Sequence, residues 1–450
     1  MSVKMKKGFW VNAAVLALPI AFQNLLTSCA SLIDTAMIVP LGNSATAAVG
    51  VAGRFTFMLN VVAFGICSGA ATLISQFWGV DDRKGIRRTF GLALVAAAIV
   101  SAVFSLLLGL APELCVALFG PEEDVALLAE GYLVILAIAV PFIMFSQVSC
   151  AALRATENVI VPLISSFASV IVNTSLNYCL ISGNFGFPAL GVYGAAIATV
   201  IGCAVQAVIV LLFLLFSKNV VKASPRELFG FSRAFARKFI VTAAPVLLNE
   251  SMWALGTNIY VMVLSRQGTE NYSAYSIYET VQQLFFVFFV GICHASAIMV
   301  GKACGRGDRE EAYETAKRFL IMTPLSGIVL GALLILARNP LLSLFEFETE
   351  GARAITSALL LFYGVWIGIR MIPYTAVCGI FRAGGDTRIG CIYEIGTLYL
   401  IGIPMVCIAA FVLHLPFVAI VATMFIAEDI PKGTLCIIYF LRKKWIRKLT

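Results

Sequence analysis

The chain has 450 residues, of which 60% are hydrophobic and 12% are charged, and its mean hydropathy is +0.96. Soluble domains usually carry about 25% charged residues, so this composition excludes an ordinary soluble protein. Crossing a bilayer takes about 20 apolar residues, and such runs recur along the whole chain. The sequence therefore predicts an all-α polytopic membrane protein.

Twelve transmembrane helices are predicted, separated by segments that carry turn residues such as Gly, Asn, Ser and Pro. Their expected ranges are 12–39, 50–78, 88–111, 126–149, 159–182, 189–216, 239–265, 272–301, 316–337, 354–379, 388–413 and 416–441. With the N-terminus inside, most of the 32 Lys and Arg residues fall in the inner connections, so both termini are expected to be cytoplasmic. The net charge of +8 is then explained by the basic residues of the cytoplasmic connections, and we expect no nucleic-acid partner.

The sequence also repeats itself at an offset of 226 residues. Pro19 aligns with Pro245 and, after a two-residue shift, Arg154 aligns with Arg382. Each repeat contains six spans, so both repeats have the same orientation. This pattern predicts two six-helix lobes related by a pseudo-twofold axis along the membrane normal, with a site between them near mid-bilayer.

The repeat also gives the expected domain boundaries. Residues 1–216 form an N-lobe and residues 239–450 form a C-lobe. The polar segment 217–238 contains Pro225 and is interpreted as a cytoplasmic linker that lets one lobe rock against the other.

Asp34 lies in the outer third of the first helix. A charged side chain at the centre of a spanning helix costs about 2.5–3.5 kcal/mol, so charged residues within spans are candidates for a functional role. Asn173 and Asn177 are four residues apart and share a helix face, and Thr199 lies at a similar depth. Carboxylate, amide and hydroxyl oxygens form a hard donor set for a proton or Na⁺. The alternative is a hydrogen-bond cluster that only holds the N-lobe together.

The repeat separates these residues from the shared scaffold. Asp34 aligns with Tyr260, and Asn173 and Asn177 align with the apolar Ile401 and Met405. The common fold therefore does not require the polar set, which favours a site specific to the first half.

Other charged or titratable residues inside predicted helices are candidates for a substrate site or a second ion site. They are Glu250, Glu279, Arg370, Glu394 and His294. Arg370 needs an acidic partner, for which Glu250 and Glu394 are the candidates. Glu394 either extends to the cytoplasmic surface or pairs with Arg388, and His294 is either a proton relay or a structural residue.

The last predicted helix carries Glu428, Asp429 and Lys432. Glu428 and Lys432 are spaced i, i+4, which predicts a neutralised pair within the helix. In the first helix, Pro19 removes a backbone hydrogen bond and is expected to kink the helix, so that bending is coupled to the charge state of Asp34.

Several enzyme classes have no counterpart in the sequence. It contains no phosphate-binding G-x-x-x-x-G-K-[ST] motif, and its two histidines, His294 and His414, cannot form H-E-x-x-H. The twelve cysteines are scattered singly and are interpreted as core residues. We therefore expect a protein that is not an enzyme and that uses no cofactor beyond a coupling ion, Na⁺ or H⁺.

Taken in order, several stretches of the chain resemble the multidrug and toxic compound extrusion (MATE) family. They are Leu18-Pro19-Ile20 with Ile33-Asp34-Thr35, Gly65 to Gly79 with Asp82-Arg83, Leu153-Arg154-Ala155-Thr156-Glu157-Asn158, Leu190-Gly191-Val192-Tyr193-Gly194, and Phe381-Arg382-Ala383-Gly384-Gly385-Asp386-Thr387. The resemblance covers nearly the whole chain.

The resemblance implies a cation-coupled antiporter that exports organic, often cationic and amphipathic, compounds by alternating access. It implies a monomer in the bacterial plasma membrane, with a small organic molecule, a monovalent cation and the lipid bilayer as partners. The aspartate of the first helix binds the coupling ion in the family, and Asp34 matches it. Family members often have an aspartate where this chain has Asn177.

The same resemblance points to an aromatic substrate cavity and leaves two other functions open. The cavity candidates are Phe55, Phe57, Tyr275, Phe285, Phe286, Phe288 and Phe289. One alternative is a lipid-linked saccharide flippase of the same superfamily, against which twelve spans and an acidic cavity argue. The other is a sensor or scaffold that does not transport.

Overall fold

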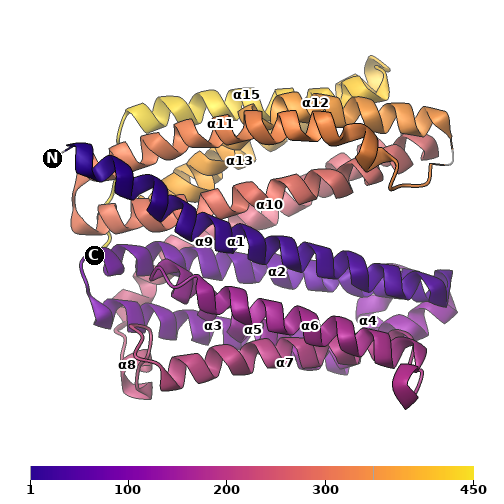
Figure 1. The fold of residues 1–450 in the computed structure, drawn as a ribbon, viewed down its shortest axis with the longest axis horizontal. Helices are drawn as coiled ribbons and strands as arrows, with labels where there is room; N and C mark the ends of the chain where they lie inside the picture. Colours follow the sequence, from indigo (N-terminus) through magenta and orange to yellow (C-terminus); the bar gives the residue numbers. More distant parts are fainter. Residues whose placement is uncertain (1, 348) are drawn as a thin grey trace. The chain divides into compact units, whose positions relative to one another are not determined.

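The computed structural model describes residues 2–347 and 349–450, with side chains from residue 8 onward. Every regular element in these residues is helical (Figure 1). The long elements are α1(Ser2–Ile38), α2(Asn43–Gly79), α3(Arg83–Leu110), α5(Glu123–Ala155), α6(Ile160–Ser182), α7(Val192–Phe216), α9(Arg233–Ser265), α10(Thr269–Arg306), α11(Arg309–Leu342), α12(Glu350–Tyr374), α13(Thr387–Thr397) and α15(Phe417–Leu441). The predicted all-α fold class is confirmed.

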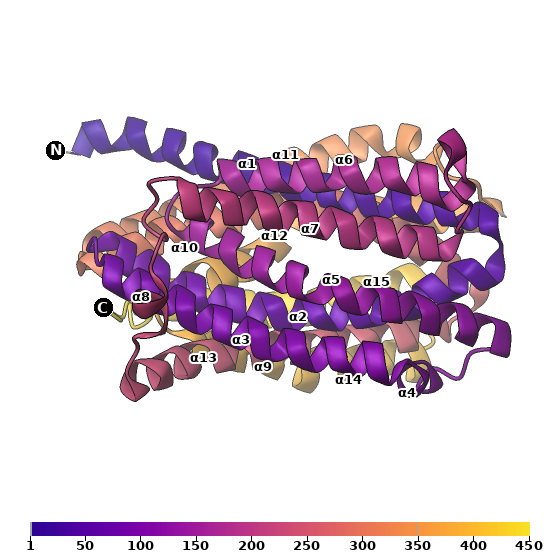
Figure 2. The same ribbon diagram turned by 90° about the horizontal axis from the view of Figure 1, so that it is seen from below.

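Short helical segments connect or extend the long ones. They are η1(Val39–Leu41), α4(Pro112–Ala117), η2(Asn184–Gly186), α8(Pro225–Phe229), η3(Thr375–Phe381), η4(Leu398–Gly402), α14(Ile403–Cys407) and η5(Ile408–Val412). Three of these, η3, η4 and η5, are π-helical and continue α12 and α13 without a break. Within each half, long helices that follow each other in sequence pack together, as α6 with α7 and α11 with α12 do in both views (Figures 1 and 2).

Eleven helices of the described chain are long and apolar enough to span a membrane. The twelfth predicted span coincides with α15, which is long enough but carries Glu428, Asp429 and Lys432. All twelve predicted ranges therefore fall on helices, although many helices begin or end several residues beyond the apolar run. The protein is a multi-pass membrane protein.

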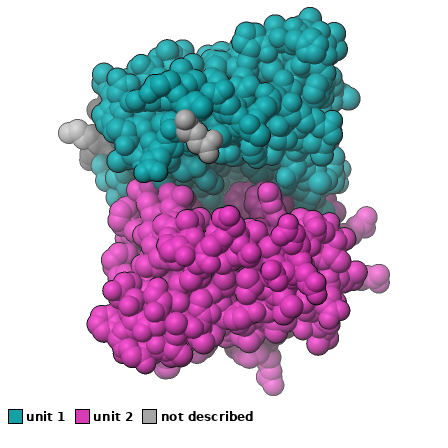
Figure 3. Space-filling view, turned by 90° about the vertical axis from the view of Figure 1, so that its right-hand side faces the viewer, with its two compact units in different colours: residues 1–21, 244–450 teal, residues 22–243 magenta. Residues whose placement is uncertain are grey.

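The chain divides into two compact units (Figure 3). Unit 2 comprises residues 22–243, and unit 1 comprises residues 1–21 and 244–450. Helices α1 and α9 thus each begin in one unit and end in the other, and both change unit next to a proline, Pro19 or Pro245. This division differs from the expected boundaries because the first helix of each repeat starts in the unit built by the other repeat.

Close helix contacts hold both crossing helices. A Cβ on Gly291 of α10 would lie 2.5 Å from the Ala17 carbonyl oxygen of α1, within unit 1. A Cβ on Gly69 of α2 would lie 2.5 Å from Ala243 Cβ of α9, within unit 2. Glycine at these two positions allows the backbones to approach, as small residues do at helix interfaces in membranes.

The two repeats share a helix-capping turn. Asp82 accepts a hydrogen bond from the Gly85 N–H (3.0 Å) at the start of α3, and Asp308 accepts one from the Glu311 N–H (2.8 Å) at the start of α11. Both are N-cap aspartates, and such caps contribute about 0.5–2 kcal/mol. Since these positions align at the 226-residue offset, the turn belongs to the common scaffold.

Part of the segment 217–238 is fixed to unit 2. Ser224 and Glu227 form a capping box at the start of α8, and Arg87 of α3 pairs with Glu227 at 2.5 Å. Gly91 of α3 leaves room for the Leu228 carbonyl, where any Cβ would clash. Hydrogen bonds from Ser224 hold the pKa of the Glu227 carboxyl below its ordinary value, and Arg87 lowers it further. The docked part of the linker thus moves with α3.

Candidate functional site

Asp34 meets the two predicted asparagines in unit 2. Asn177 of α6 donates to Asp34 Oδ1 at 2.6 Å. Asn173 lies one turn away on the same helix, and both asparagines are buried, whereas Asp34 is partly exposed. Hydrogen bonds donated to a carboxylate favour its charged form. The three residues therefore form one contact group, as predicted.

The amide of Asn173 links this group to α7. In one orientation it donates to Thr199 Oγ1 at 3.5 Å and accepts from Asn177 at 3.4 Å. In the reverse orientation it donates to Asp34 Oδ1 at 3.0 Å and accepts from the Thr199 N–H at 3.3 Å, and both of its polar atoms are satisfied. Gly202 makes the approach of α7 possible, because a Cβ there would lie 3.0 Å from Asn173 Cβ.

The contacts give the site a different character from the expected oxygen cage. At Asp34 the asparagines present N–H donors, while Asn177 Oδ1 is buried with no hydrogen-bond partner. In the described residues no three His, Cys, Asp or Glu side chains gather where they could hold a metal ion. Tyr132 of α5, which sequence reasoning missed, lies within electrostatic reach of Asp34. The arrangement suits a carboxylate that alternates between a hydrogen-bonded anion and a cation-bound form.

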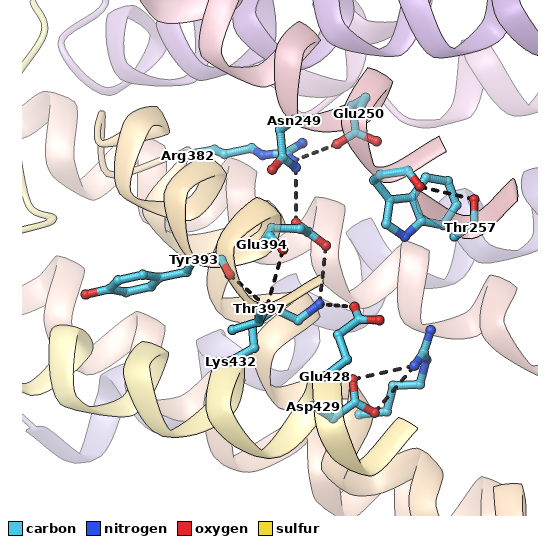
Figure 4. Close-up of polar contacts among 12 residues, drawn as sticks. Asn249, Glu250, Thr257, Arg382, Tyr393, Glu394, Thr397, Glu428, Asp429 and Lys432 are labelled. Carbon is cyan, nitrogen blue, oxygen red and sulfur yellow. Dashed lines mark hydrogen bonds and ion pairs between the residues drawn. The ribbon is translucent and has the colours of Figure 1, made fainter. Parts of the chain in front are cut away.

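Unit 1 contains a chain of buried charged contacts, which we call the charged node (Figure 4). Arg382 donates to Glu250 Oε1 at 2.6 Å. Next to it, Asn249 donates to Glu394 Oε2 at 3.0 Å. Two of the candidate acids thus belong to one group of contacts, because the adjacent residues Asn249 and Glu250 contact Glu394 and Arg382. Neither acid pairs with Arg370.

Lys432 of α15 extends the node. Its ammonium lies 2.7 Å from Glu428 Oε1 and 3.3 Å from Glu394 Oε1 (Figure 4). The predicted i, i+4 pair of Glu428 and Lys432 is confirmed. The expected partner of Glu394 was wrong: the carboxylate is buried against Lys432 and Asn249 instead of pairing with Arg388.

Asp429 closes the far end of the node. Arg370 of α12 lies 3.4 Å from Asp429 Oδ2, and Trp366 Nε1 donates to the same oxygen at 2.9 Å. Arg370 also stacks over the Phe425 ring, 4.4 Å from its centroid. The predicted partners of Arg370, Glu250 or Glu394, were therefore wrong. Helical spacing cannot reveal this pair, because it joins α12 to α15.

The remaining candidates lie outside the charged node. Glu279 is exposed and His294 is half-buried, both on α10. Among the aromatic residues expected to line a substrate cavity, Tyr275 and Phe289 pack in the hydrophobic core of unit 1 instead. Phe55 is likewise buried, whereas Phe57 and Phe288 are exposed.

Unit 2 holds a counterpart of the node without carboxylates, which sequence reasoning missed. Arg154 donates to Gln23 Oε1 at 3.2 Å, and Ser166 Oγ accepts from Gln23 (2.7 Å) and from Gln206 (3.1 Å). Among the described residues no carboxylate pairs with Arg154. We call these four residues the neutral node, because the partners of Arg154 in it are uncharged.

The repeat offset relates the two nodes position by position. Gln23 aligns with Asn249 and Gln206 with Lys432 at 226 residues, and Arg154 aligns with Arg382 and Ser166 with Glu394 at 228. Both nodes therefore occupy equivalent places in their repeats. The repeat offset could have revealed the neutral node from the sequence, because each of its four residues aligns with a polar or charged residue in the other repeat.

Spanning helices, a doubled helical unit and buried charges inside the spans define the class as a polytopic membrane protein built from an internal repeat. The MatE family model matches residues 19–179 and again residues 245–408, so its second match starts 226 residues after the first. The two matches together cover well over half of the chain. The chain belongs to the MatE family.

Similar proteins match about three quarters of the chain or more. "Probable multidrug resistance protein NorM" of Thermotoga maritima is 25% identical over 96% of this chain and 92% of its own length. "Probable multidrug resistance protein YoeA" of Bacillus subtilis is 24% identical over 77% of this chain and 76% of its own. A crystal structure of MATE in complex with MaL6 has a TM-score of 0.86 at 18% identity, covering 96% of this chain and 95% of that one. The fold is therefore that of solved MATE structures.

Proposed function

We propose that this protein is a secondary active efflux transporter, a cation-coupled antiporter that exports organic, amphipathic or cationic compounds by alternating access. The observation that carries the proposal is the Asp34 group, a carboxylate bonded by Asn177 and adjoining Asn173 within spanning helices. A charge inside a span is costly and marks an ion or substrate path. Membership of the MatE family and similarity to proteins named for multidrug resistance support the same function.

Asp34 is the proposed coupling residue, with Asn173, Asn177 and Thr199 as its supporting shell. The ion is Na⁺ or H⁺. Cation binding removes the negative charge that the amide N–H groups stabilise, and α1 then favours a different packing. Pro19 lies fifteen residues earlier in the same helix and weakens its hydrogen bonding, which supports bending of α1 between the two states.

The charged residues of unit 1 are proposed to serve the substrate or a second ion. Glu250, Arg370 and Glu394 belong to the charged node, and Glu279 and His294 of α10 are further candidates. Carboxylates and aromatic faces both favour cationic ligands. We further propose a monomer in the bacterial plasma membrane with both termini cytoplasmic and no catalytic activity.

Efflux from proteoliposomes tests the coupling role of Asp34. A fluorescent organic cation is loaded, and a sodium gradient and a pH gradient are imposed separately. Asp34→Asn should abolish gradient-driven efflux under whichever gradient drives the wild type. Asp81→Asn, at an exposed turn residue, is the matched control and should retain wild-type efflux.

The outcomes separate the proposed function from its alternatives. Normal gradient-driven efflux by Asp34→Asn would refute the coupling role. Movement of a lipid-linked saccharide by the wild type, without organic-cation efflux, would favour the flippase. Binding without movement of either substrate would indicate a sensor.

A further inference from the structure

Unit 2 has a groove between α3 and α5 that lies apart from the polar contacts described above. Its volume of about 650 Å³ falls within the range of ligand-binding pockets, about 300–1,000 Å³. Residues of α3 between Leu94 and Leu106 line one side, and Pro141, Met144 and Phe145 of α5 line the other. No lining residue in the described part of the chain is charged, so the groove suits hydrocarbon better than an ion or an organic cation.

The groove follows from a proline in α5. Pro141 has no N–H, so the Ala137 carbonyl one turn earlier lacks its helical donor. Ser105 of α3 supplies a replacement, because its hydroxyl donates to the Ala137 carbonyl at 2.9 Å. Serine side chains of neighbouring helices commonly satisfy such carbonyls inside a membrane. This bond joins α3 to α5 beside the groove and engages the Ser105 hydroxyl, which leaves the lining almost wholly apolar.

The groove has the length of one leaflet and is open at its side. The α3 residues that line it extend over about 18 Å at 1.5 Å per residue, and half of a bilayer hydrocarbon core is about 15 Å thick. Ala98, Ala102 and Leu106 are exposed, although they lie on a spanning helix. The groove can therefore be reached from the lipid, along most of the depth of one leaflet.

Helix α8 closes the end of the groove nearest the start of α3 (Figure 2). The Leu228 carbonyl lies on Gly91 of α3, and the next residue, Phe229, lines the groove. The Phe229 side chain is 54% exposed. Exposed aromatic rings are typical of the membrane–water interface, so α8 marks the level of the lipid headgroups.

Two exposed arginines lie at this end of the groove. Arg88, Val95 and Ala102 are spaced seven residues apart on α3, so they share a helix face that leads into the groove. On α8, Arg226 precedes Phe229 by three residues and shares its side of the helix. Neither arginine side chain has a hydrogen bond or an ion pair among the described residues.

The surrounding charge is strongly positive. Segments 81–88 and 217–230 contain seven Lys or Arg residues and three Asp or Glu residues. The three acids are engaged, since Asp81 pairs with Arg83, Glu227 pairs with Arg87, and Asp82 caps α3. The other five basic side chains have no acidic partner in the described chain. Basic residues beside a spanning helix attract anionic lipid headgroups.

We propose that unit 2 binds one anionic phospholipid at this place. One acyl chain lies in the groove against Ala98 and Ala102, and the phosphate lies beside Arg88 and Arg226. An apolar groove as long as a leaflet and a cationic end at the headgroup level together match the two parts of such a lipid. This binding goes beyond the proposed transport function and does not depend on it.

Native mass spectrometry of the purified full-length protein tests the headgroup contact. Dioleoyl phosphatidylglycerol and dioleoyl phosphatidylcholine, which share acyl chains and differ in net charge, are titrated separately. The wild type should retain one phosphatidylglycerol, bound more tightly than phosphatidylcholine. Arg226→Gln should weaken phosphatidylglycerol binding about fivefold and leave phosphatidylcholine unchanged. Arg233→Gln, at an exposed residue beyond α8, should behave like the wild type.

Filling the groove tests the acyl-chain contact. Ala98→Phe should abolish retention of both lipids, because the new ring occupies the place of the chain. Val103→Phe is the matched control on the same helix, since Val103 is exposed but does not line the groove. Ala102→Phe gives the same test at an exposed position one turn later, should Ala98→Phe fail to fold.

Three results would overturn the proposal. The first is equal binding of the two lipids by the wild type, and the second is unchanged phosphatidylglycerol retention in Ala98→Phe and Ala102→Phe, or an equal loss in Val103→Phe. The third is a lipid-free dimer that Ala98→Phe dissociates, which would assign the groove to a second copy of the chain.

Discussion

The two units place polar contacts at equivalent positions but distribute charge in opposite ways. In unit 2 the node is built from Gln23, Arg154, Ser166 and Gln206, whereas the charged node of unit 1 contains four carboxylates, two arginines and a lysine. At the Asp34 group the relation is reversed, since unit 1 has Tyr260, Ile401 and Met405 at the aligned positions. The two repeats thus place polar contacts between helices at equivalent positions, but the charges of the residues at those positions differ.

The largest effect that tests this comparison is expected at the paired arginines. Arg382→Gln leaves Glu250 buried without a cation and should destabilise the protein by about 3–5 kcal/mol. Arg154→Gln removes only a hydrogen bond to a neutral amide, so its loss should be smaller, about 1.5–3 kcal/mol. Thermal unfolding of the two purified variants in the same detergent measures the difference.

A rescue experiment sharpens the arginine comparison. Adding Glu250→Gln to Arg382→Gln removes the uncompensated charge and should recover most of the lost stability. Asn24 aligns with Glu250 at the 226-residue offset, and Asn24→Ala should recover nothing when it is added to Arg154→Gln. Equal losses in the two single variants, without rescue, would contradict the assignment of one charged and one neutral node.

A smaller effect is expected when the charged node is rebuilt from the residues of the neutral one. Lys432→Gln alone leaves Glu394 and Glu428 without a cation and should lower the melting temperature. Its cost should stay below that of Arg382→Gln, because Glu394 keeps its hydrogen bond from Asn249. The triple variant Glu394→Ser, Glu428→Gln and Lys432→Gln should regain near wild-type stability, since uncharged replacements of buried ion pairs are often tolerated.

The sequence was sufficient for the helices and the repeat, because apolar runs and aligned prolines are properties of the chain alone. It also predicted the Asp34 group, because a charge inside a span is costly, and the Glu428–Lys432 pair, because the two residues are four apart on one helix. The partner of Arg370 and the bond from Asn249 to Glu394 could not be predicted this way. They join helices whose relative rotation is set by packing.

The smallest effect concerns the docked part of the segment 217–238. Hydrogen bonds and Arg87 lower the pKa of Glu227 in the folded state. The contribution of this contact is therefore complete at neutral pH and is lost as the pH falls through the lowered pKa. Hydrogen exchange of residues 220–229, corrected for its intrinsic pH dependence, should accelerate in acid.

A matched variant checks the role of Glu227 in this contact. Glu227→Gln should exchange faster than the wild type at neutral pH and should show less change on acidification. Lys222→Gln, at an exposed residue of the same segment, should behave like the wild type. If protection in Glu227→Gln matched the wild type at every pH, the Arg87 contact would not hold α8.

The crossing of α1 and α9 between the units has a consequence for biosynthesis. Residues 1–21 leave the ribosome before residues 244–450, which complete the unit to which they belong. The start of α1 must therefore wait in the membrane until α10 has been inserted and Gly291 can receive Ala17. Cutting the gene between the repeats would separate the start of α1 from the rest of unit 1 and the start of α9 from the rest of unit 2. Neither half is therefore expected to fold correctly without the other.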